Sequence, residues 1–242
     1  MSQILLLDIG NTLTKAAAIE NGQFITVENF ADDTQLIHWL EVRPHFKRTL
    51  ICAVRPLPEE IARWARLHPL VSVLDHNTPL PFSSAYESPQ TLGSDRIALA
   101  AAAFKRFPKK NVLVIDMGSC ITYDFLDAQG VYQGGAISPG MLMRFKAMNS
   151  FTAKLPLVEP LAGAELIGRN TEASLQSGVI NGIQAEIDGV ISRYEADYKD
   201  LTVLIGGGDN KYFDKRFKVN IFAGSNLVLE GLNVIVDFNE SQ

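Results

Sequence analysis

Two segments of this chain resemble each other and recur at one fixed distance. Residues 3–14 and 111–122 are each an apolar run that ends in Asp-x-Gly and continues into small polar residues. Their aspartates, Asp8 and Asp116, are 108 residues apart, and the same offset relates their glycines. An apolar run that ends in turn-forming residues predicts a buried strand followed by a polar turn. The chain is therefore expected to consist of two halves that begin alike, which restricts its fold more than any other feature.

The shared register continues into the next turn of each half. Gly22 follows Asn21 between two apolar runs, and Gly130 follows Gln129 at the corresponding place of the second half. Glycine between apolar runs is typical of a hairpin turn. Each half should thus open with a strand, a polar turn and a hairpin. The alternative is a chance likeness between two buried strands, which the length of the shared register makes the weaker interpretation.

Strands and helices are expected to alternate through the rest of the chain. The expected strands cover residues 50–54, 70–74 and 201–205, and the expected helices cover residues 58–67, 94–107 and 171–198. This alternation predicts an α/β fold. No low-complexity linker separates the halves, so we expect one lobe over residues 1–110 and a second over 111–242, with a cleft between them.

Composition excludes several classes of protein. The formal net charge is -5 and the sequence pI is about 5.4, without runs of Lys or Arg. Binding to nucleic acid or to a membrane surface requires clustered cations, so neither is expected. Two isolated cysteines, Cys52 and Cys120, favour neither a disulfide framework nor a zinc site. The chain opens directly on a strand-like run and has no apolar stretch of roughly 18 residues, so we expect a cytoplasmic protein.

The two Asp-x-Gly turns have the chemistry of a phosphate site. Gly10 and Gly118 allow the backbone to approach a phosphate and offer it N–H groups. Asp8 and Asp116 would repel phosphate, so each implies an intervening cation or an ordered water. Lys15 can place a positive charge against the phosphates. For a single turn, local hydrogen bonding by the aspartate would explain the pattern equally well; two turns in register favour a polyphosphate site.

A third glycine-rich turn, Gly206-Gly207-Gly208, follows the strand expected at residues 201–205. A purine base could lie close to the backbone at such a turn, because glycine has no side chain to block it. The other known phosphate patterns, G-x-x-x-x-G-K-[ST] and G-x-G-x-x-G after a strand, do not occur in the chain. Cys120 is interpreted as a small buried residue and not as a nucleophile.

The segment before the second expected helix holds the candidate base. Asp95 falls in the first helical turn, where the helix dipole favours an ionised carboxylate. Arg96 stands in the same turn, where a cation is disfavoured, which suggests that it serves a ligand. An ionised Asp near a transferring phosphate can accept the proton of an attacking hydroxyl. A simple N-cap role for Asp95 is equally compatible with these residues.

Taken together, these segments resemble the type III pantothenate kinases of the actin-like ATPase superfamily. The resemblance covers nearly the whole chain. It rests on an ordered set of segments: Asp8-Ile9-Gly10-Asn11-Thr12 with Lys15, Gly93-Ser94-Asp95-Arg96 preceded by Tyr86, Asp116-Met117-Gly118-Ser119, Gly134 to Gly140, Gly168 to Thr171, and Gln176-Ser177-Gly178. It implies two ribonuclease-H-like lobes and ATP-dependent phosphorylation of pantothenate to 4'-phosphopantothenate, the first step of coenzyme A synthesis.

The resemblance also implies a role for each matching residue. Asp95 would accept the proton of pantothenate, and the metal ligand would be Asp116, which would hold potassium or ammonium beside ATP-bound magnesium. The residues implied to bind pantothenate are Tyr86, Gly93, Ser94, Asp95, Arg96 and Thr171. The residues implied to bind ATP are Asp8, Ile9, Gly10, Asn11, Thr12, Leu13, Thr14, Lys15 and Ser119. A homodimer is implied as well, with Thr171 acting across its interface.

The chain departs from the family pattern at Ser119-Cys120, where Thr-Ala is common. Serine keeps the hydroxyl, and Cys120 adds bulk to the turn. Gly178 and Gly182 lie inside the last expected helix, where each costs roughly 1 kcal/mol relative to Ala, so we interpret them as points of close packing between lobes or subunits. Two other functions remain open: a kinase of the same fold for another small alcohol or carboxylate, and a nucleotide-dependent regulator without turnover.

Overall fold

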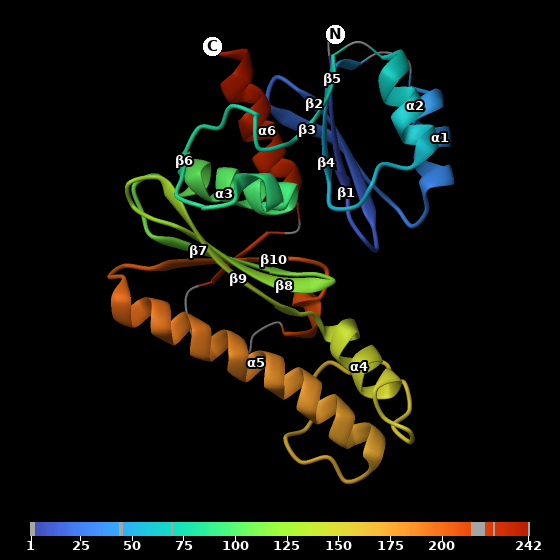
Figure 1. Ribbon diagram of the computed structural model, residues 1–242, viewed down its shortest axis with the longest axis vertical. Coiled ribbons are helices and arrows are strands. Elements are labelled where there is room, and N and C mark those ends of the chain that lie inside the picture. Colours follow the sequence, from blue (N-terminus) through green and yellow to red (C-terminus); the bar gives the residue numbers. More distant parts are fainter. Residues whose placement is uncertain (1–2, 44–45, 69, 214–220, 225, 242) are drawn as a thin grey trace. The chain divides into compact units, whose positions relative to one another are not determined.

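The computed structural model describes residues 3–43, 46–68, 70–213, 221–224 and 226–241. It divides into two compact units, one formed by Met1–Arg106 together with Asn226–Gln242 and the other by Phe107–Ser225. Each unit is a mixed sheet with helices packed on it (Figure 1). The α/β class expected from the alternating pattern is therefore confirmed.

The first unit contains a five-stranded sheet in the order β3-β2-β1-β4-β5. Its strands are β1 (Gln3–Ile9), β2 (Thr14–Glu20), β3 (Gln23–Phe30), β4 (Phe46–Ala53) and β5 (Val71–Val73). Its helices are α1 (Asp33–Glu41), α2 (Glu59–Leu67), α3 (Ser94–Arg106) and α6 (Leu227–Glu240), and its short elements are β6 (Ser83–Ser84) and η1 (Pro89–Thr91). The strands β1, β2 and β3 pair antiparallel in chain order. On the other side of β1, β4 runs parallel to β1, and β5 runs parallel to β4.

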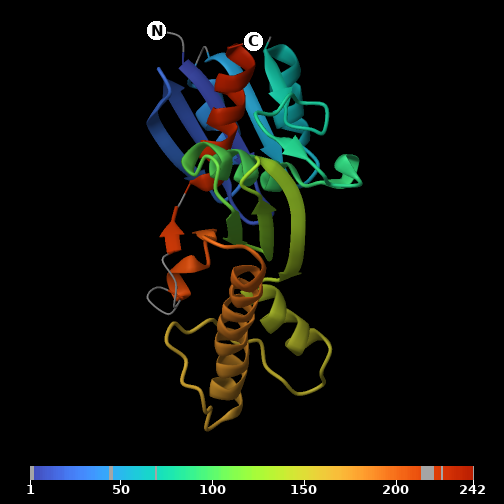
Figure 2. The same cartoon turned by 90° about the vertical axis from the view of Figure 1, so that its left-hand side faces the viewer.

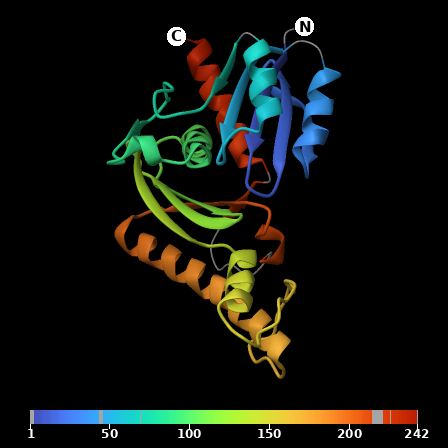
Figure 3. The same cartoon turned by 45° about the vertical axis from the view of Figure 1, so that its right-hand side comes forward.

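Helices cover both faces of this sheet, which explains why β1 is a continuous apolar run. Leu5 and Leu7 pack with α1 and α2, and Leu6 packs on the opposite face with α3 and α6. Figure 3 shows the two pairs of helices on opposite sides of the strands. All three leucines are fully buried. A strand that is buried on both faces shows no apolar–polar alternation.

The second unit repeats the same strand order, with β9-β8-β7-β10-β11 corresponding to the sheet of the first unit. Its strands are β7 (Val112–Met117), β8 (Cys120–Leu126), β9 (Val131–Pro139), β10 (Thr202–Gly206) and β11 (Ile221–Ala223). Its helices are α4 (Met141–Ser150) and α5 (Thr171–Asp197), followed by the short η2 (Asn210–Tyr212). In both units an antiparallel hairpin lies on one side of the central strand and parallel strands lie on the other. The repeat predicted from the sequence thus corresponds to a repeated topology.

The core of the second unit lies between its sheet and α5. Ile180, Ile183 and Ile187 of α5 are fully buried and belong to the same apolar cluster as Leu113 and Ile115 of β7. Figure 2 shows α4 beside the first half of α5, with the 151–170 segment joining the two helices. The helix therefore serves as the main apolar cover of this sheet.

The C-terminal segment does not follow the expected division at residue 111. The expectation assigned residues 111–242 to one lobe, whereas the structure places α6 in the first unit. Gly231 of α6 passes so close to α3 that a Cβ there would lie 1.7 Å from the carbonyl oxygen of Ala98. Arg106 and Glu230 add two hydrogen bonds of 2.8 and 2.7 Å between the same helices. Packing against α3 therefore returns the end of the chain to its first half.

Among the described residues, no helix is both long enough and apolar enough to cross a bilayer.

Candidate active site

The first polar turn joins β1 to β2 through residues 10–13. The N–H of Gly10 donates to the carbonyl of Leu13 at 3.2 Å, and a Cβ on Gly10 would lie only 2.7 Å from that oxygen. The turn is therefore too tight for a side chain at this position. A hollow of about 270 Å³ lies beside it, lined by residues 10–14, 30–33 and Arg55. Asn11, Thr12 and Leu13 line this hollow and are exposed.

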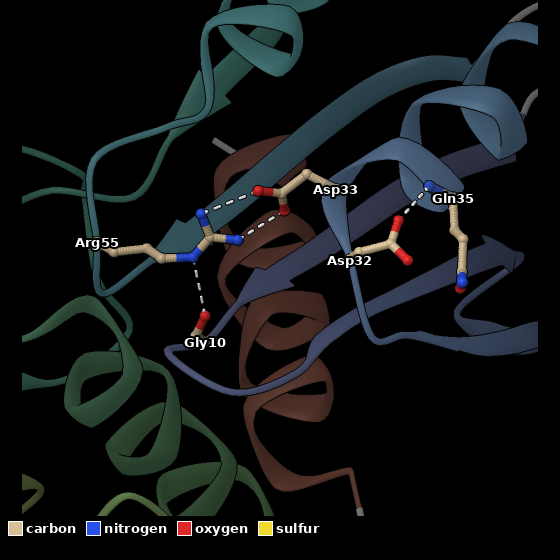
Figure 4. A network of polar contacts seen from close by, with 5 residues as sticks. All are labelled: Gly10, Asp32, Asp33, Gln35 and Arg55. Carbon is tan, nitrogen blue, oxygen red and sulfur yellow. Dashed lines mark hydrogen bonds and ion pairs between the residues drawn. The ribbon is translucent and has the colours of Figure 1, made fainter.

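Arg55 ties this turn to the start of α1. Its Nε donates to the carbonyl oxygen of Gly10 at 3.1 Å, and its two terminal nitrogens donate to both carboxylate oxygens of Asp33 at 2.6 and 3.2 Å (Figure 4). Asp32 caps α1 by accepting the N–H of Gln35 at 2.9 Å. Sequence analysis missed both Arg55 and Asp33, because no spacing pattern connects a residue of the loop after β4 with the first residue of α1.

Asp8 lies at the carboxyl end of β1, among ionisable groups from neighbouring strands. In the strand register it faces Lys15 of β2 on one side and Cys52 of β4 on the other. Burial raises the pKa of Asp8 to about 7; the Lys15 ammonium lowers it, and the charge of Asp95 raises it further. Desolvation is the largest of these effects. Asp8 therefore lies within electrostatic range of the candidate base.

The start of α3 is attached to the end of β4 by the Ser94 side chain. Its Oγ donates to the carbonyl of Ala53 at 3.0 Å and accepts from the N–H of Ala53 at 3.2 Å. The Cys52 thiol also donates to this oxygen at 3.3 Å, and burial raises the pKa of that thiol, so it stays protonated. In the structure the Ser94 hydroxyl holds α3 beside the strand that carries Cys52, and the contact of Ser94 with substrate stays a prediction.

Asp95 is fixed by the backbone around it. Its Oδ1 accepts the N–H of Arg96 at 2.8 Å, and a Cβ on Gly93 would lie 2.4 Å from the same oxygen. The Asp95 carboxylate therefore occupies the space that a side chain at position 93 would fill. The helix dipole was expected to favour the ionised carboxylate of Asp95, whereas burial has the largest influence in the structure and raises its pKa, against the N–H and the charge of Arg96. A raised pKa makes a carboxylate a stronger proton acceptor.

Tyr86 and Arg96, both predicted to bind substrate, come together in the first unit. The guanidinium carbon of Arg96 lies 5.7 Å from the centre of the Tyr86 ring, within the range of a cation–π interaction. Arg96 is only 5% exposed, although it stands in the first turn of a helix. The pair therefore forms an ordered cationic and aromatic group immediately next to Asp95.

The second polar turn, between β7 and β8, is shorter. The N–H of Gly118 donates to the carbonyl of Cys120 at 2.9 Å, and Ser119 is exposed between them. Gly140 packs against the turn, where a Cβ would lie 2.4 Å from the carbonyl oxygen of Ser119. Asp116 lies at the carboxyl end of β7, beside Gly206 of β10. Of the two predicted residues, Asp116 therefore lies near the end of β7 and Ser119 lies in the turn that follows it.

The two hairpins differ by one residue in register. Asp8 faces Lys15 across the first hairpin, whereas Asp116 faces Thr122 across the second. Tyr123 holds the sequence position that corresponds to Lys15, but it faces Ile115 and donates to Glu186 at 2.8 Å. The Oγ1 atom of Thr122 is buried and has no hydrogen-bond partner in the part of the chain that the structure describes.

The third glycine-rich turn packs directly against the end of β7. Gly207 has a φ of +93°, and a Cβ there would lie 2.3 Å from the carbonyl oxygen of Met117. The N–H of Asp209 donates to the same oxygen at 3.0 Å. Burial raises the pKa of Asp209, which Lys211 lowers in part. Backbone and a carboxylate therefore surround the strand end that also carries Asp116.

Thr171 belongs to the second unit, whereas the other predicted substrate residues belong to the first. It is the exposed first residue of α5, next to the cap residue Asn170, whose side chain accepts the N–H of Ala173 at 2.8 Å. In the described ranges, no three His, Cys, Asp or Glu side chains gather closely enough to hold a metal by themselves.

The family model for type III pantothenate kinases matches residues 4–193 of this chain. A type III pantothenate kinase from Christiangramia forsetii is 42% identical over 241 residues, covering 98% of this chain and 99% of that protein. One from Phocaeicola vulgatus is 42% identical over 238 residues, covering 98% of each chain.

Solved structures resemble the fold at lower sequence identity. A Campylobacter jejuni protein, described as a Baf family transcriptional activator, has a TM-score of 0.64 at 21% identity and covers 98% of this chain and all of its own. A ROK family glucokinase from Streptomyces griseus, solved with glucose and AMPPNP, has a TM-score of 0.53 at 10% identity over the whole of both chains. At these identities the likeness concerns the fold alone.

Proposed function

Because this chain belongs to the type III pantothenate kinase family, with the α/β fold of the actin-like ATPases, we propose that Asp95 is the base of its phosphoryl transfer. Its reaction is the ATP-dependent phosphorylation of pantothenate, in coenzyme A biosynthesis. The single observation that carries the proposal is the placement of Asp95. The carboxylate is held at the start of α3, within electrostatic range of Asp8, and burial raises its pKa.

In the proposed reaction, a hydroxyl oxygen of pantothenate forms a bond to the terminal phosphorus of ATP. The bond from that phosphorus to the bridging oxygen of ADP breaks, and the hydroxyl proton passes to an oxygen of Asp95. Phosphoryl transfer through a loose transition state depends mainly on positioning and charge neutralisation. A base of this kind contributes about 10²–10⁴-fold.

Arg96 and Tyr86 are proposed to hold pantothenate beside that base. Arg96 can bind a carboxylate through two parallel hydrogen bonds, and Tyr86 offers a ring already in contact with the guanidinium. Gly93 and Ser94 shape the start of α3 on which both depend. Thr171 is proposed as a further substrate contact, contributed from α5.

ATP is proposed to bind along Asp8, Ile9, Gly10, Asn11, Thr12, Leu13, Thr14, Lys15 and Ser119. The exposed residues 11–13 line the hollow beside the tight turn at Gly10, and Lys15 lies opposite Asp8 in the strand register. A divalent metal accompanies the nucleotide of a kinase, and we propose magnesium, which is usually held by one or two carboxylates together with substrate phosphates. Its chemistry is to neutralise charge on the phosphates as transfer proceeds.

Asp116 is proposed as the ligand of a monovalent cation, potassium or ammonium. The residues present fit such an ion, because Thr122 lies directly opposite in the strand register and side chains of an opposed pair share one face of the sheet. The buried Thr122 hydroxyl has no partner among the described residues, so it can serve as a second oxygen ligand. An unsatisfied buried hydroxyl is otherwise costly.

A homodimer in the cytoplasm is the proposed working form. Its support comes from the segment between α4 and α5, where Phe151 is 88% exposed, Leu166 80% and Ile167 73%. Large apolar side chains gathered in one segment are typical of an interaction surface. Gly178 and Gly182 of α5 have open space in place of a side chain, which would admit a second helix at close range. Light scattering on the purified protein measures this assembly.

The test of the function is to measure ADP release and phosphopantothenate formation with and without pantothenate. We expect Asp95→Asn to lower kcat by about 10²–10⁴-fold while ATP still binds. Asp237→Asn is the matched control, since burial also raises the pKa of this carboxyl in the same unit, and it should leave turnover unchanged. Near wild-type turnover in Asp95→Asn would remove Asp95 from the reaction. A better acceptor in a panel of small alcohols would instead favour the same-fold kinase alternative.

A further inference from the structure

The guanidinium of Arg55 joins three segments of the first unit at the phosphate turn. Gly10, which receives its Nε–H, belongs to the turn; Asp33, which receives its two terminal nitrogens, begins α1; and Arg55 itself follows β4 (Figure 4). A guanidinium is planar and its donors form a rigid fork, so these contacts fix direction as well as distance.

The bond to Gly10 determines where the next N–H of the turn points. The peptide between Gly10 and Asn11 is planar and trans, so its carbonyl and N–H point in opposite directions. Because the Gly10 oxygen accepts from Arg55, the N–H of Asn11 is directed away from the guanidinium. Asn11 is exposed and lines the hollow beside the turn. One hydrogen bond thus orients an amide assigned to ATP under the proposed function.

Two further backbone hydrogen bonds hold the edges of the turn. The N–H of Gly10 donates to Leu13, and the N–H of Val54 donates to the carbonyl of Ile9, each at 3.2 Å. Neither bond involves the carbonyl of Gly10. Arg55 therefore supplies the contact that fixes the peptide plane between Gly10 and Asn11.

Asp33 binds the terminal nitrogens of Arg55, so these nitrogens are not available for a direct contact with phosphate. Its carboxylate occupies both terminal nitrogens of the guanidinium, at 2.6 and 3.2 Å, and opposes its charge. A phosphate that approached those nitrogens would have to displace this pair. The two side chains are 29% and 30% exposed, so the pair is partly shielded from solvent.

We propose that Arg55 is a positioning residue for nucleotide binding. It sets the Gly10–Asn11 peptide so that the Asn11 amide is ready for a polyphosphate oxygen, and Asp33 keeps the guanidinium in the plane that this requires. The proposal rests on the assignment of the first turn to ATP. Preformed donors cost no reorganisation when the ligand binds, so their loss appears as lost affinity.

A matched pair elsewhere in the same unit provides the control. Arg106 donates to both carboxylate oxygens of Glu230, at 2.8 and 2.7 Å, with side-chain exposures of 33% and 28%. It joins α3 to α6 and has no part in the proposed site. Arg106→Met and Arg55→Met therefore remove similar ion pairs, and only the second removes a bond to the phosphate turn.

The experiment measures three quantities for each full-length variant: ATP affinity by calorimetry with magnesium, the two KM values, and the thermal midpoint. We expect Arg55→Met to weaken ATP binding about 10-fold, within the roughly 10²-fold range of a 1 Å misplacement. The KM for pantothenate should stay unchanged, and Arg106→Met should keep wild-type ATP affinity. Arg55→Lys keeps the charge without the fork, so it should lose most of the same affinity.

Three results would each overturn the inference. Wild-type ATP affinity in Arg55→Met, with a thermal shift equal to that of Arg106→Met, would make Arg55 merely structural. Full affinity in Arg55→Lys would mean that charge alone suffices. If Arg55→Met does not fold, the milder Asp33→Asn takes its place and should weaken ATP binding several-fold, while unchanged affinity contradicts the proposal. Direct ATP binding separates these results from a failure of the proposed function, which would appear as wild-type protein that binds ATP and does not phosphorylate pantothenate.

Discussion

The two polar turns have similar sequences and the same place in their sheets, yet they present different chemistry. In the first, a four-residue turn places Lys15 opposite Asp8. In the second, three residues separate the paired Met117 and Ile121, one fewer than in the first, and Thr122 stands opposite Asp116. Because side chains alternate along a strand, a shift of one residue changes which side chain faces the acid. Two equivalent aspartates thus receive different partners from nearly the same sequence.

The supports of the turns differ as well. Arg55 and Asp33 brace the first turn through a guanidinium, whereas Gly140 braces the second through backbone packed close to Ser119. The cations at the first turn therefore come from flanking elements, Lys15 of β2 and Arg55 after β4, and Arg55 is paired with Asp33. The second presents a carboxylate with a buried hydroxyl, oxygens that suit a small cation. The two turns therefore share one strand framework and differ in the side chain that faces the aspartate.

Replacing Lys15 tests this difference with the largest expected effect. In Lys15→Met the ammonium across from Asp8 is lost, and kcat/KM for ATP should fall about 10²–10³-fold, the range for one group that stabilises transferring charge. Added potassium should not restore it, because a freely diffusing cation does not replace an ammonium that the strand register holds opposite Asp8. Steady-state kinetics at several KCl concentrations measure both points.

Lys47→Met is the control for a lost surface ammonium in the same unit. Lys47 pairs with Glu240 at 3.3 Å and is 55% exposed, so its removal should leave kcat/KM unchanged. Recovery of Lys15→Met by potassium would show that the first turn accepts an external cation too, which would remove the contrast between the turns.

Much of the fold follows from local signals in the sequence. The recurring strand–turn pattern predicted two units, and their sheets have the same strand order. The helix expected over residues 58–67 begins after Pro58, and the one expected over 171–198 starts at Thr171. The return of α6 to the first unit had no such signal, because it depends on packing between Gly231 and Ala98, far apart in the chain.

The site was predictable where neighbouring residues carry it, and less so elsewhere. Asp95, Arg96 and Tyr86 were identified from one segment, and the structure brings the last two into contact. Arg55 follows β4 and Asp33 begins α1, 22 residues earlier in the chain, so their pairing becomes visible only in the folded unit. The register shift at Asp116 also had no signal in the sequence. The two strand–turn segments align at a constant offset of 108 residues, which predicts Tyr123 opposite Asp116, whereas the structure pairs Asp116 with Thr122.

Thr122→Val tests the proposed cation site at the second turn, and its expected effect is smaller than that of Lys15→Met. Valine keeps the shape and removes the hydroxyl, so the potassium concentration for half-maximal activity should rise about 5-fold, the equivalent of a contact worth about 1 kcal/mol. Without potassium, the thermal midpoint should not fall, because this buried hydroxyl has no partner among the described residues.

Thr26→Val is the matched control for that experiment. The Thr26 hydroxyl of β3 is also buried without a partner among the described residues, but it lies on the edge strand of the other sheet. It should reproduce the effect on stability and leave the potassium response unchanged. An unaltered potassium response in Thr122→Val would exclude this hydroxyl as a cation ligand and leave Asp116 without its proposed companion.

The stability of the ligand-free protein depends on the charge of Asp8. Burial raises the pKa of Asp8 from 3.8 to about 7, so the folded state binds a proton that the unfolded state has already released. Stability therefore falls as pH rises from about 4 to about 7 and remains lower above that range. Asparagine at position 8 carries no charge, so it removes this decrease in stability with rising pH.

Asp8→Asn should consequently raise the thermal midpoint at pH 8 relative to wild type, and should raise it little at pH 4. Each 1 kcal/mol corresponds to roughly 2–4 °C for a chain of this length. Asp75→Asn gives the opposite sign, because hydrogen bonds from Asn77 and Thr78 lower the pKa of that exposed carboxyl and its ionised form is the stabilised one. A lower midpoint for Asp8→Asn at pH 8 would mean that attraction to Lys15 outweighs desolvation, and the first turn would then be stabilised by its charge pair in the absence of nucleotide.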